Sequence, residues 1–326
     1  MSGCRPTMPL IVLAAGAALS APVPASAGAE GGPRMPSVPG KVPGEPSRPR
    51  NPCRSKDHPE IAERLGARIR AALAGRAGTV SVAVADHGRG LRCALAADRR
   101  YDSASVVKAT VLGALLRRAA DEHRAPTAAE RSLAHAMITR SDNRAASTLW
   151  RSLGRERLAR FAERAGMSRT VLGPGGYWGL TQITAHDQLE LLARFTRHND
   201  LLPDRARAYA LRLLREVVPA QGWGTPAGCP HGVTAHVKNG WLPRHGRFWR
   251  VHSIGAFEGP GRSYTIVVLT RDTPSMAYGV TTIERVARAV HRTLNPGMRA
   301  AIGDDAAGAA PGGVPAASDG SVPPGR

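Results

Sequence analysis

The chain has 326 residues, of which 42% are hydrophobic, so it can fill the core of one large domain or of two ordinary ones. Its formal net charge is +20, from 45 Lys and Arg against 25 Asp and Glu. The arginines are scattered along the chain without a basic run or interleaved aromatic residues, so the charge does not indicate nucleic-acid binding. Attraction to an anionic cell envelope is a weaker alternative.

The N-terminus has the order of a secretory signal. Met-Ser-Gly-Cys-Arg is followed by an apolar stretch from Leu10 to Leu19 and then by Ala25-Ser26-Ala27. We therefore expect residues 1–27 to be a signal peptide that is cleaved after Ala27, so that the mature protein is secreted. The apolar stretch is too short and too poorly flanked for a membrane span, and an uncleaved anchor is the alternative.

Composition also predicts the limits of the folded domain. Residues 28–52 are rich in Gly and Pro and predict a linker, and residues 297–326 repeat that composition and predict a disordered tail. The folded domain is expected at 53–296. It contains Cys53, Cys93 and Cys229, so an exported protein should form one disulfide and leave one thiol over. No pair has the spacing of metal ligands, so no metal site is expected.

Hydrophobic periodicity predicts a helix at 58–74, strands at 79–86 and 91–95, and a buried helix at 105–120. Further helices are expected at about 127–140, 143–152, 155–165, 184–197 and 203–217, with a glycine-rich loop at 168–183. Strands at 232–238, 247–257 and 263–271 and a helix at about 281–294 complete the domain. This order predicts an α+β fold in which a five-stranded antiparallel sheet is flanked by helices and joined to an all-helical subdomain.

The first motif with chemical potential is Ser105-Val106-Val107-Lys108, at the start of the predicted buried helix. Residues three apart share a helix face, so the hydroxyl and the amine can meet. A serine becomes a nucleophile beside a base, and a desolvated lysine can be that base. The alternative is that Ser105 caps the helix and Lys108 lies on the surface. The apolar neighbours of Lys108 weaken that alternative, because they leave no solvated face.

Lysine is scarce in this chain, and this scarcity supports a chemical role for Lys108. It occurs only at positions 41, 56, 108 and 238, and the remaining 41 of the 45 basic residues are arginine. Guanidinium serves wherever only positive charge is needed. We infer that a position kept as lysine needs an amine that can lose its proton.

The second motif, Ser141-Asp142-Asn143, lies between two predicted helices. Its hydroxyl can pass a proton to a leaving nitrogen, and the Asn143 amide can hold a substrate carbonyl. The alternative is a helix cap, because all three residue types cap helices well.

The third motif, Lys238-Asn239-Gly240, ends the predicted strand at 232–238. A strand edge that ends in glycine lets a substrate backbone pair alongside it. The backbone N–H of Trp241 could join that of Ser105 as an oxyanion hole. The alternative is an Asn-Gly hairpin turn.

In this order the three motifs resemble the active-site signatures of class A β-lactamases and penicillin-binding proteins, and residues 136–146 are also similar to the class A segment. The resemblance implies a β-lactamase-like fold and an acyl-enzyme formed on Ser105. It implies catalytic roles for Ser105, Lys108, Ser141 and Lys238 and substrate binding by Asn143, Asn239, Gly240 and Trp241. It implies no cofactor, and we expect a monomer that acts on a small β-lactam or a cell-wall peptide-like substrate.

The resemblance also predicts part of the covalent structure. It places the 91–95 and 232–238 strands at opposite edges of the sheet, which would separate Cys93 from Cys229. The expected disulfide is therefore Cys53–Cys93.

The sequence departs from class A in three places. Asn239 stands where those families usually have Thr or Ser, and only 36 residues separate Ser105 from Ser141. The region from Arg164 to His186 has no acidic residue, where class A enzymes carry a loop glutamate. We therefore expect slow deacylation, with His186 as a possible substitute base. A substrate carboxylate could be held by Arg247 or Arg250, and the strand phase does not choose between them.

Three alternatives to a β-lactamase remain open: a D,D-peptidase of the same fold, a serine esterase of the same fold, and a non-hydrolytic module that binds envelope components. A fluorescent penicillin and a chromogenic cephalosporin discriminate between them. Turnover favours a β-lactamase, and a covalent label without turnover favours a peptidase or a binding module.

Overall fold

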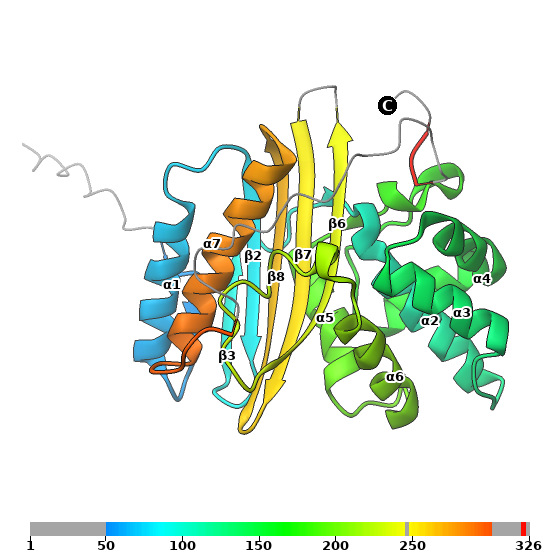
Figure 1. Cartoon of the computed structure of the whole chain (residues 1–326), viewed down its shortest axis with the longest axis horizontal. Helices are drawn as coiled ribbons and strands as arrows, with labels where there is room; N and C mark the ends of the chain where they lie inside the picture. The colour runs from blue at the N-terminus through cyan, green and yellow to red at the C-terminus, as the bar shows by residue number, and fades with distance from the viewer. Residues whose placement is uncertain (1–49, 245–247, 302–320, 324–326) are drawn as a thin grey trace, which may run out of the picture. The chain divides into compact units, whose positions relative to one another are not determined.

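A computed structural model describes residues 50–244, 248–301 and 321–323, which belong to one compact unit. At its centre is an antiparallel sheet in the order β1-β3-β2-β8-β7-β6 (Figure 1). Its strands are β1 (Cys53–Arg54), β2 (Thr79–Asp86), β3 (Leu91–Leu95), β6 (Thr234–Arg244), β7 (Phe248–Gly259) and β8 (Arg262–Thr273). The predicted α+β architecture is confirmed. The five expected strands are present, and the prediction of five is corrected to six because the short β1 pairs outside β3.

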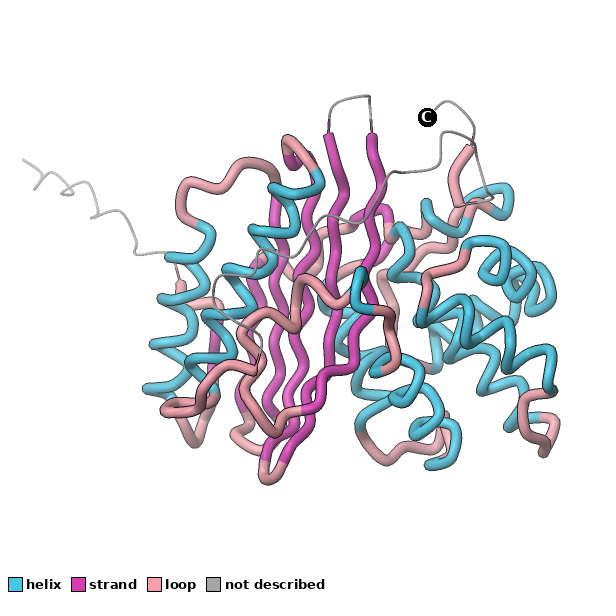
Figure 2. Tube along the Cα trace, in the orientation of Figure 1, coloured by secondary structure: helices cyan, strands magenta, loops and turns pink. Residues whose placement is uncertain are grey.

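Both faces of the sheet are covered, as Figure 2 shows. Helices α1 (Pro59–Leu73) and α7 (Met276–Leu294) pack on one face, and α5 (Ala185–Thr196) lies against the other beside the helical subdomain. Strand residues alternate between two hydrophobic cores, because successive side chains of a strand point to opposite faces. In β2, Val82 and Val84 join the core under α1 and α7, whereas Ala83 and Ala85 join the core of the helical side. Such double burial explains why β2 reads as a continuous apolar run.

The helical subdomain consists of α2 (Val107–Asp121), α3 (Ala128–Thr139), α4 (Asn143–Arg164) and α6 (Asp204–Arg215). Helix α2 is buried almost all round, as its apolar sequence predicted. Helix α3 begins with a reciprocal cap between Thr127 and Glu130. The two helices predicted at 143–152 and 155–165 correspond to α4, in which Gly154 interrupts the helical backbone with φ of +74°.

Short elements connect the subdomain to the sheet. Strands β4 (Tyr101–Asp102) and β5 (Gln182–Ile183) pair with each other, so the segment before Ser105 is joined to the glycine-rich loop. That loop contains the 3₁₀ turns η2 (Pro174–Gly176) and η3 (Trp178–Leu180). A further turn, η4 (Pro219–Gln221), precedes β6.

The predicted disulfide is confirmed: Cys53 and Cys93 are bonded and are also register partners of β1 and β3. Cys229 is a buried free thiol, and burial raises its pKa to about 12. The structure therefore gives Cys229 the character of an unreactive core residue. No helix in the described part of the chain is long and apolar enough to cross a membrane.

Contacts of the folded unit continue past the predicted domain limits. Asn51 donates a hydrogen bond to the carbonyl of Ala62, and Ala301 donates to the carbonyl of Cys229. The C-terminal residues 321–323 also touch the unit, because the N–H of Gly179 donates to the carbonyl of Ser321 at 2.8 Å. Residues on both sides of the predicted 53–296 limits thus make contacts with the folded unit. The predicted signal peptide and residues 302–320 of the predicted tail lie outside the described residues.

Candidate active site

Ser105 lies in the 3₁₀ turn η1 (Ala104–Val106), one turn before α2. The preceding residue, Ala104, has a left-handed backbone with φ of +46°, which an alanine rarely adopts. Strand β6 approaches this turn closely at Gly240, where an added Cβ would lie 2.9 Å from the backbone nitrogen of Ser105. Glycine at this position is therefore what lets the strand backbone lie beside the serine.

Lys108 is fully buried on α2, so the surface role considered for it is excluded. Its ammonium group donates to the carbonyl of Ser141 at 2.6 Å, to the Ser141 hydroxyl at 3.1 Å and to the side-chain oxygen of Asn143. The centroid of the Trp178 indole ring lies 4.8 Å from the same nitrogen. The first and second motifs, 33 residues apart in the chain, thus meet around one amine.

In the second motif, one residue caps a helix and the other two do not. Asp142 is the N-cap of α4, and its side chain accepts a hydrogen bond from the N–H of Ala145 at 2.7 Å. The side chains of Ser141 and Asn143 turn toward Lys108 instead. Ser141 has a left-handed backbone with φ of +56°. Backbone strain of this kind concentrates at functional sites.

Lys238 reaches the same hydroxyl from the sheet. Its ammonium group donates to Ser141 Oγ at 3.0 Å and to the carbonyl of Asn239 at 2.8 Å. The side chain is buried, and burial lowers its pKa to about 7. Ser141 Oγ therefore accepts from two lysines. A hydroxyl has two lone pairs and one proton, so its proton remains to be donated elsewhere.

Asn239 does not face the two lysines. Its amide nitrogen donates to the carbonyls of Gln221 and Trp223, each at 2.9 Å, and its side chain is buried. The predicted substrate contact through this amide is therefore not what the structure presents, because successive residues of β6 point to opposite faces. Instead, Asn239 fastens β6 to the loop around η4. The side chain of Gln221 in that loop donates in turn to the carbonyl of Arg140 at 2.8 Å.

Trp241 also turns its side chain away from Lys238, and its ring packs edge-on against Trp223 at a centroid distance of 6.0 Å. Arg250 is held between acids, 2.8 Å from Asp272 and 3.7 Å from Asp102. It is thus engaged within the protein rather than presented as a lone cation for a substrate carboxylate. Arg247 lies outside the described residues.

The sequence did not predict that Trp178 lies beside the residues of the motifs. Trp178 is buried, and its indole N–H donates to the hydroxyl of Ser147 at 3.0 Å. The buried hydroxyl of Ser103 lies 3.3 Å from its carbonyl oxygen, so the loop is tied to the segment before Ser105. The only available signal was an aromatic residue inside a glycine-rich loop. An indole is a donor only and cannot act as a base.

His186 is separated from these contacts. Its ring nitrogen lies 3.2 Å from Asp98, which also pairs with Arg169 at 3.4 Å. Its neighbour Asp187 accepts from the backbone of Arg169 and the hydroxyl of Thr170, so it holds the start of the loop. These contacts support structural roles for both residues. Among the described residues, no group of three or more His, Cys, Asp or Glu side chains could hold a metal ion.

Sequence comparison supports what the geometry suggests. Residues 127–294, just over half of the chain, match the β-lactamase enzyme family. The chain belongs to this family. No curated protein sequence matches it.

Solved structures extend the likeness to the fold. A class A β-lactamase from Bacteroides cellulosilyticus superposes with a TM-score of 0.64 at 18% identity, covering 72% of this chain and 98% of that one. A β-lactamase from Xanthomonas campestris gives 0.60 at 19% identity, covering 72% and 99%. PBP-A gives 0.62 at 21% identity, covering 71% and 95%. At such identities the likeness establishes the β-lactamase fold.

Proposed function

We propose that this member of the β-lactamase family is a secreted serine hydrolase that forms an acyl-enzyme on Ser105 with β-lactams or related amides and releases it slowly. The observation that carries the proposal is the position of Ser141 Oγ, which accepts hydrogen bonds from both Lys108 and Lys238. Because the buried amines of Lys108 and Lys238 both contact the Ser141 hydroxyl, protons can be passed between these three groups. The disulfide suggests an oxidising, extracellular environment, which supports secretion.

In the proposed acylation, Lys108 in its neutral form takes the proton of Ser105, which attacks the carbonyl carbon of the amide. The backbone N–H groups of Ser105 and Trp241 hold the developing oxyanion. The close approach of Gly240 to the nitrogen of Ser105 supports this pairing, because it sets the strand backbone beside the turn.

The leaving nitrogen then needs a proton. Ser141 gives its own proton to that nitrogen and is resupplied by the ammonium group of Lys238. A pKa near 7 suits Lys238 to this step, because both of its protonation states are accessible at neutral pH. The side chain of Asn143 accepts a hydrogen bond from Lys108 through its oxygen and is a candidate for holding a substrate carbonyl through its amide nitrogen.

We test the nucleophile with a fluorescent penicillin. Ser105→Ala is expected to lose the covalent label completely, because Ser105 is the serine of the single Ser-x-x-Lys sequence in the chain. Ser103→Ala, two residues away, is the control and should retain the label. Peptide mapping of the adduct should find it on Ser105. A label that persists in Ser105→Ala would contradict the assignment, and no label on the native protein would favour the non-hydrolytic module.

Slow release follows from the loop that covers Lys108. Hydrolysis of the ester needs a base beside the attacking water, and the loop offers Trp178 at this place and no carboxylate. Loss of a general base costs about 10²–10⁴-fold in rate. A mass-spectrometric time course should therefore find the acyl-enzyme persisting long after acylation is complete. His186→Ala should leave its lifetime unchanged, because His186 is engaged with Asp98. Deacylation as fast as acylation would contradict the proposal.

A D,D-peptidase of the same fold is the second candidate, and the same missing base favours it over a rapid β-lactamase. A chromogenic cephalosporin and a cell-wall peptide ending in a D,D-dipeptide separate the two. Peptide cleavage with a persistent penicillin label would identify a peptidase. Rapid cephalosporin turnover would identify a β-lactamase.

A further inference from the structure

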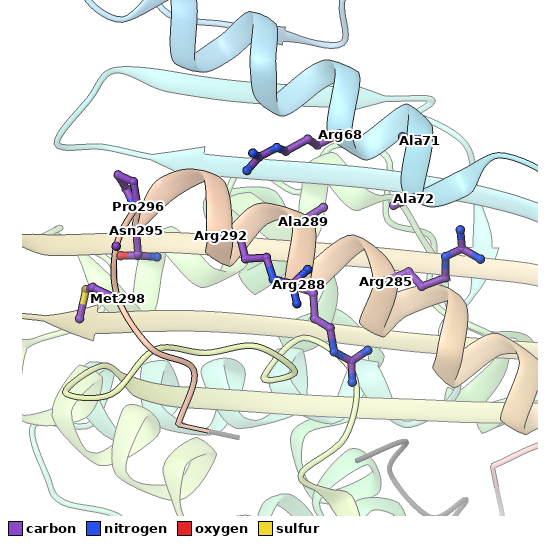
Figure 3. Close-up of a pocket in the computed structure, with 11 residues that line it drawn as sticks. Arg68, Ala71, Ala72, Arg285, Arg288, Ala289, Arg292, Asn295, Pro296 and Met298 are labelled. Carbon is purple, nitrogen blue, oxygen red and sulfur yellow. The ribbon is translucent and has the colours of Figure 1, made fainter. Parts of the chain in front are cut away.

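Two arginines of the β6–β7 hairpin are largely buried. On the face of the sheet covered by α1 and α7, arginines such as Arg68 and Arg285 are exposed and line a groove (Figure 3). The side chains of Arg244 in β6 and Arg250 in β7, in contrast, are only 17% and 11% exposed. Burial removes much of the hydration of a guanidinium group, so it needs an acid as a partner.

Asp102 of β4 is an acid that both arginines share. Its Oδ2 lies 3.2 Å from Nε of Arg244 and 3.7 Å from Nε of Arg250. Its Oδ1 accepts a hydrogen bond from the side-chain amide of Gln182 at 2.6 Å. Arg250 also pairs with Asp272 at 2.8 Å, whereas in the described part of the chain Arg244 pairs with Asp102 alone. The position of Arg244 therefore depends on Asp102.

The backbone of Asp102 is held by the sheet. The ring of His252 in β7 is buried, with Nδ1 3.2 Å from the backbone nitrogen of Thr270 and Nε2 2.8 Å from the carbonyl oxygen of Asp102. A backbone N–H can only donate, so Nδ1 is the acceptor and Nε2 carries the proton that it donates to Asp102. Burial lowers the pKa of His252 to about 4, which keeps the ring neutral at pH 7. Asp102 is thus held through both its backbone and its side chain.

The Asp102–Arg244 pair lies close in sequence to both donors of the proposed oxyanion hole. Asp102 precedes Ser105 by three residues, and Arg244 follows Trp241 by three residues. The backbone N–H groups of Ser105 and Trp241 come from separate elements, η1 and β6. In the described sheet β6 is an edge strand that pairs with β7, so no further strand holds its other side. The ion pair joins the two segments that the sheet leaves unconnected.

We propose that Asp102 and Arg244 are positioning residues, and that their ion pair holds the N–H groups of Ser105 and Trp241 at the separation that acylation requires. The inference rests on the proposed acyl-enzyme function. Oxyanion donors stabilise the transition state when they are already in place, and a misplacement of about 1 Å can cost on the order of 10²-fold in rate. Asp102 and Arg244 act through the backbone, without contact to the reacting atoms.

Stopped-flow acylation at saturating penicillin tests the proposal. Asp102→Asn keeps the shape of the side chain and removes its charge, and Arg244→Gln removes the charge of its partner. Each should lower the limiting acylation rate by about 10–100-fold and leave the noncovalent affinity for penicillin within about threefold of native, because only the transition state carries the oxyanion. The double variant should be no slower than the slower single variant, since one ion pair is lost in each case. Arg244→Lys keeps a positive charge and should recover most of the rate.

The matched control breaks an ion pair of similar burial elsewhere. Arg118 pairs with Glu130 at 2.5 Å, with side chains 11% and 12% exposed, in the last turn of α2 and away from Ser105. Arg118→Gln should lower the melting temperature about as much as Arg244→Gln and leave the acylation rate within about twofold of native. An equal loss of rate in this control would overturn the proposal in favour of a general effect of stability. Native rates in D102N and R244Q, or additive losses in the double variant, would overturn it as well.

Hydrogen exchange without substrate separates this inference from the proposed function. Peptides that cover residues 103–106 and 240–244 should exchange faster in D102N and R244Q than in the native protein, and at the native rate in Arg118→Gln. Native exchange in D102N and R244Q would overturn the proposal even if acylation slowed. A native protein that penicillin does not label would contradict the proposed function, and faster exchange in the two variants would still support the ion pair as the link between the two segments.

Discussion

On the face of the sheet covered by α1 and α7, His291 is buried with both ring nitrogens paired. Nε2 donates to the carbonyl of Thr225 and Nδ1 accepts from the hydroxyl of Tyr264, each at 2.8 Å. Burial lowers its pKa to about 4, so the ring is neutral at pH 7. On the other face, Lys238 is just as buried, but it donates to Ser141 and makes no ion pair with an acid in the described part of the chain.

The two groups illustrate different uses of burial. In its neutral form, His291 donates one hydrogen bond and accepts another, so both ring nitrogens are paired. Such pairing is what a buried polar residue in a core needs. Lys238 has a pKa of about 7, so burial keeps it able to change protonation state at neutral pH at the expense of stability. A buried amine that is not neutralised by an acid is therefore a stronger sign of catalysis than a buried titratable group as such.

The comparison can be broken most directly by exchanging one residue on each face. Lys108→Arg keeps the charge but cannot accept a proton, so acylation by penicillin should fall by about 10²–10⁴-fold. His291→Gln should lower stability and leave the acylation rate of the folded protein within about twofold of native. Stopped-flow acylation rates provide the measurement. Native-rate acylation by Lys108→Arg would make Lys108 a structural residue.

Stability as a function of pH should separate the two faces next. Between about pH 6.5 and 4, His291 is protonated in the unfolded state but not in the folded state. The free energy of unfolding therefore falls as the pH falls through this window, by on the order of 3 kcal/mol. The unfolded state also binds a proton on Lys238 between about pH 7 and 10.5, so stability from this group rises as pH rises through that window, by on the order of 5 kcal/mol.

Urea unfolding of matched variants measures these two windows. Lys238→Met is neutral at every pH, so its stability advantage over the native protein should be greatest below pH 7 and should shrink toward pH 10.5. His291→Gln should make the loss of stability in the acid window smaller without abolishing it, because burial also lowers the pKa of His252 to about 4, and it should leave the alkaline window unchanged. A constant difference between Lys238→Met and the native protein at all pH values would contradict the lowered pKa.

The smallest expected effect concerns Asn239, whose side chain lies on the face away from Lys238. Asn239→Thr has a single hydroxyl donor in place of two amide donors, so it should lower stability by about 1–2 kcal/mol. Acylation should slow only moderately, because the loop of Gln221 holds Arg140 beside Ser141 less firmly. Asn239→Asp removes both donors and should be worse than Thr in melting temperature and rate. If Asp were tolerated as well as Asn, the two carbonyl contacts would carry no weight.

Prediction from sequence succeeded where the information is local. Apolar runs predicted five of the strands, and the apolar surroundings of Lys108 predicted its burial. The order of the motifs, through the resemblance they carry, identified the family, and the same resemblance suggested the Cys53–Cys93 bond. The short β1 escaped because two residues carry no periodicity. The domain limits at 53 and 296 stay a prediction, and the contacts of Asn51 and Ala301 with residues distant in the sequence could not be foreseen from composition.

The sequence by itself predicts which residues could do chemistry: residue type, spacing and the resemblance that the motifs carry together single out Ser105, Lys108, Ser141 and Lys238. Only the tertiary structure decided what each side chain meets. In the structure, Asp142 caps a helix and the side chain of Asn239 lies on the face away from Lys238. Trp178 lies over Lys108, and arginines of α7 lie beside α1. The reason is physical: helix and strand periods determine which residues share a face, whereas the packing of elements distant in sequence determines what that face contacts.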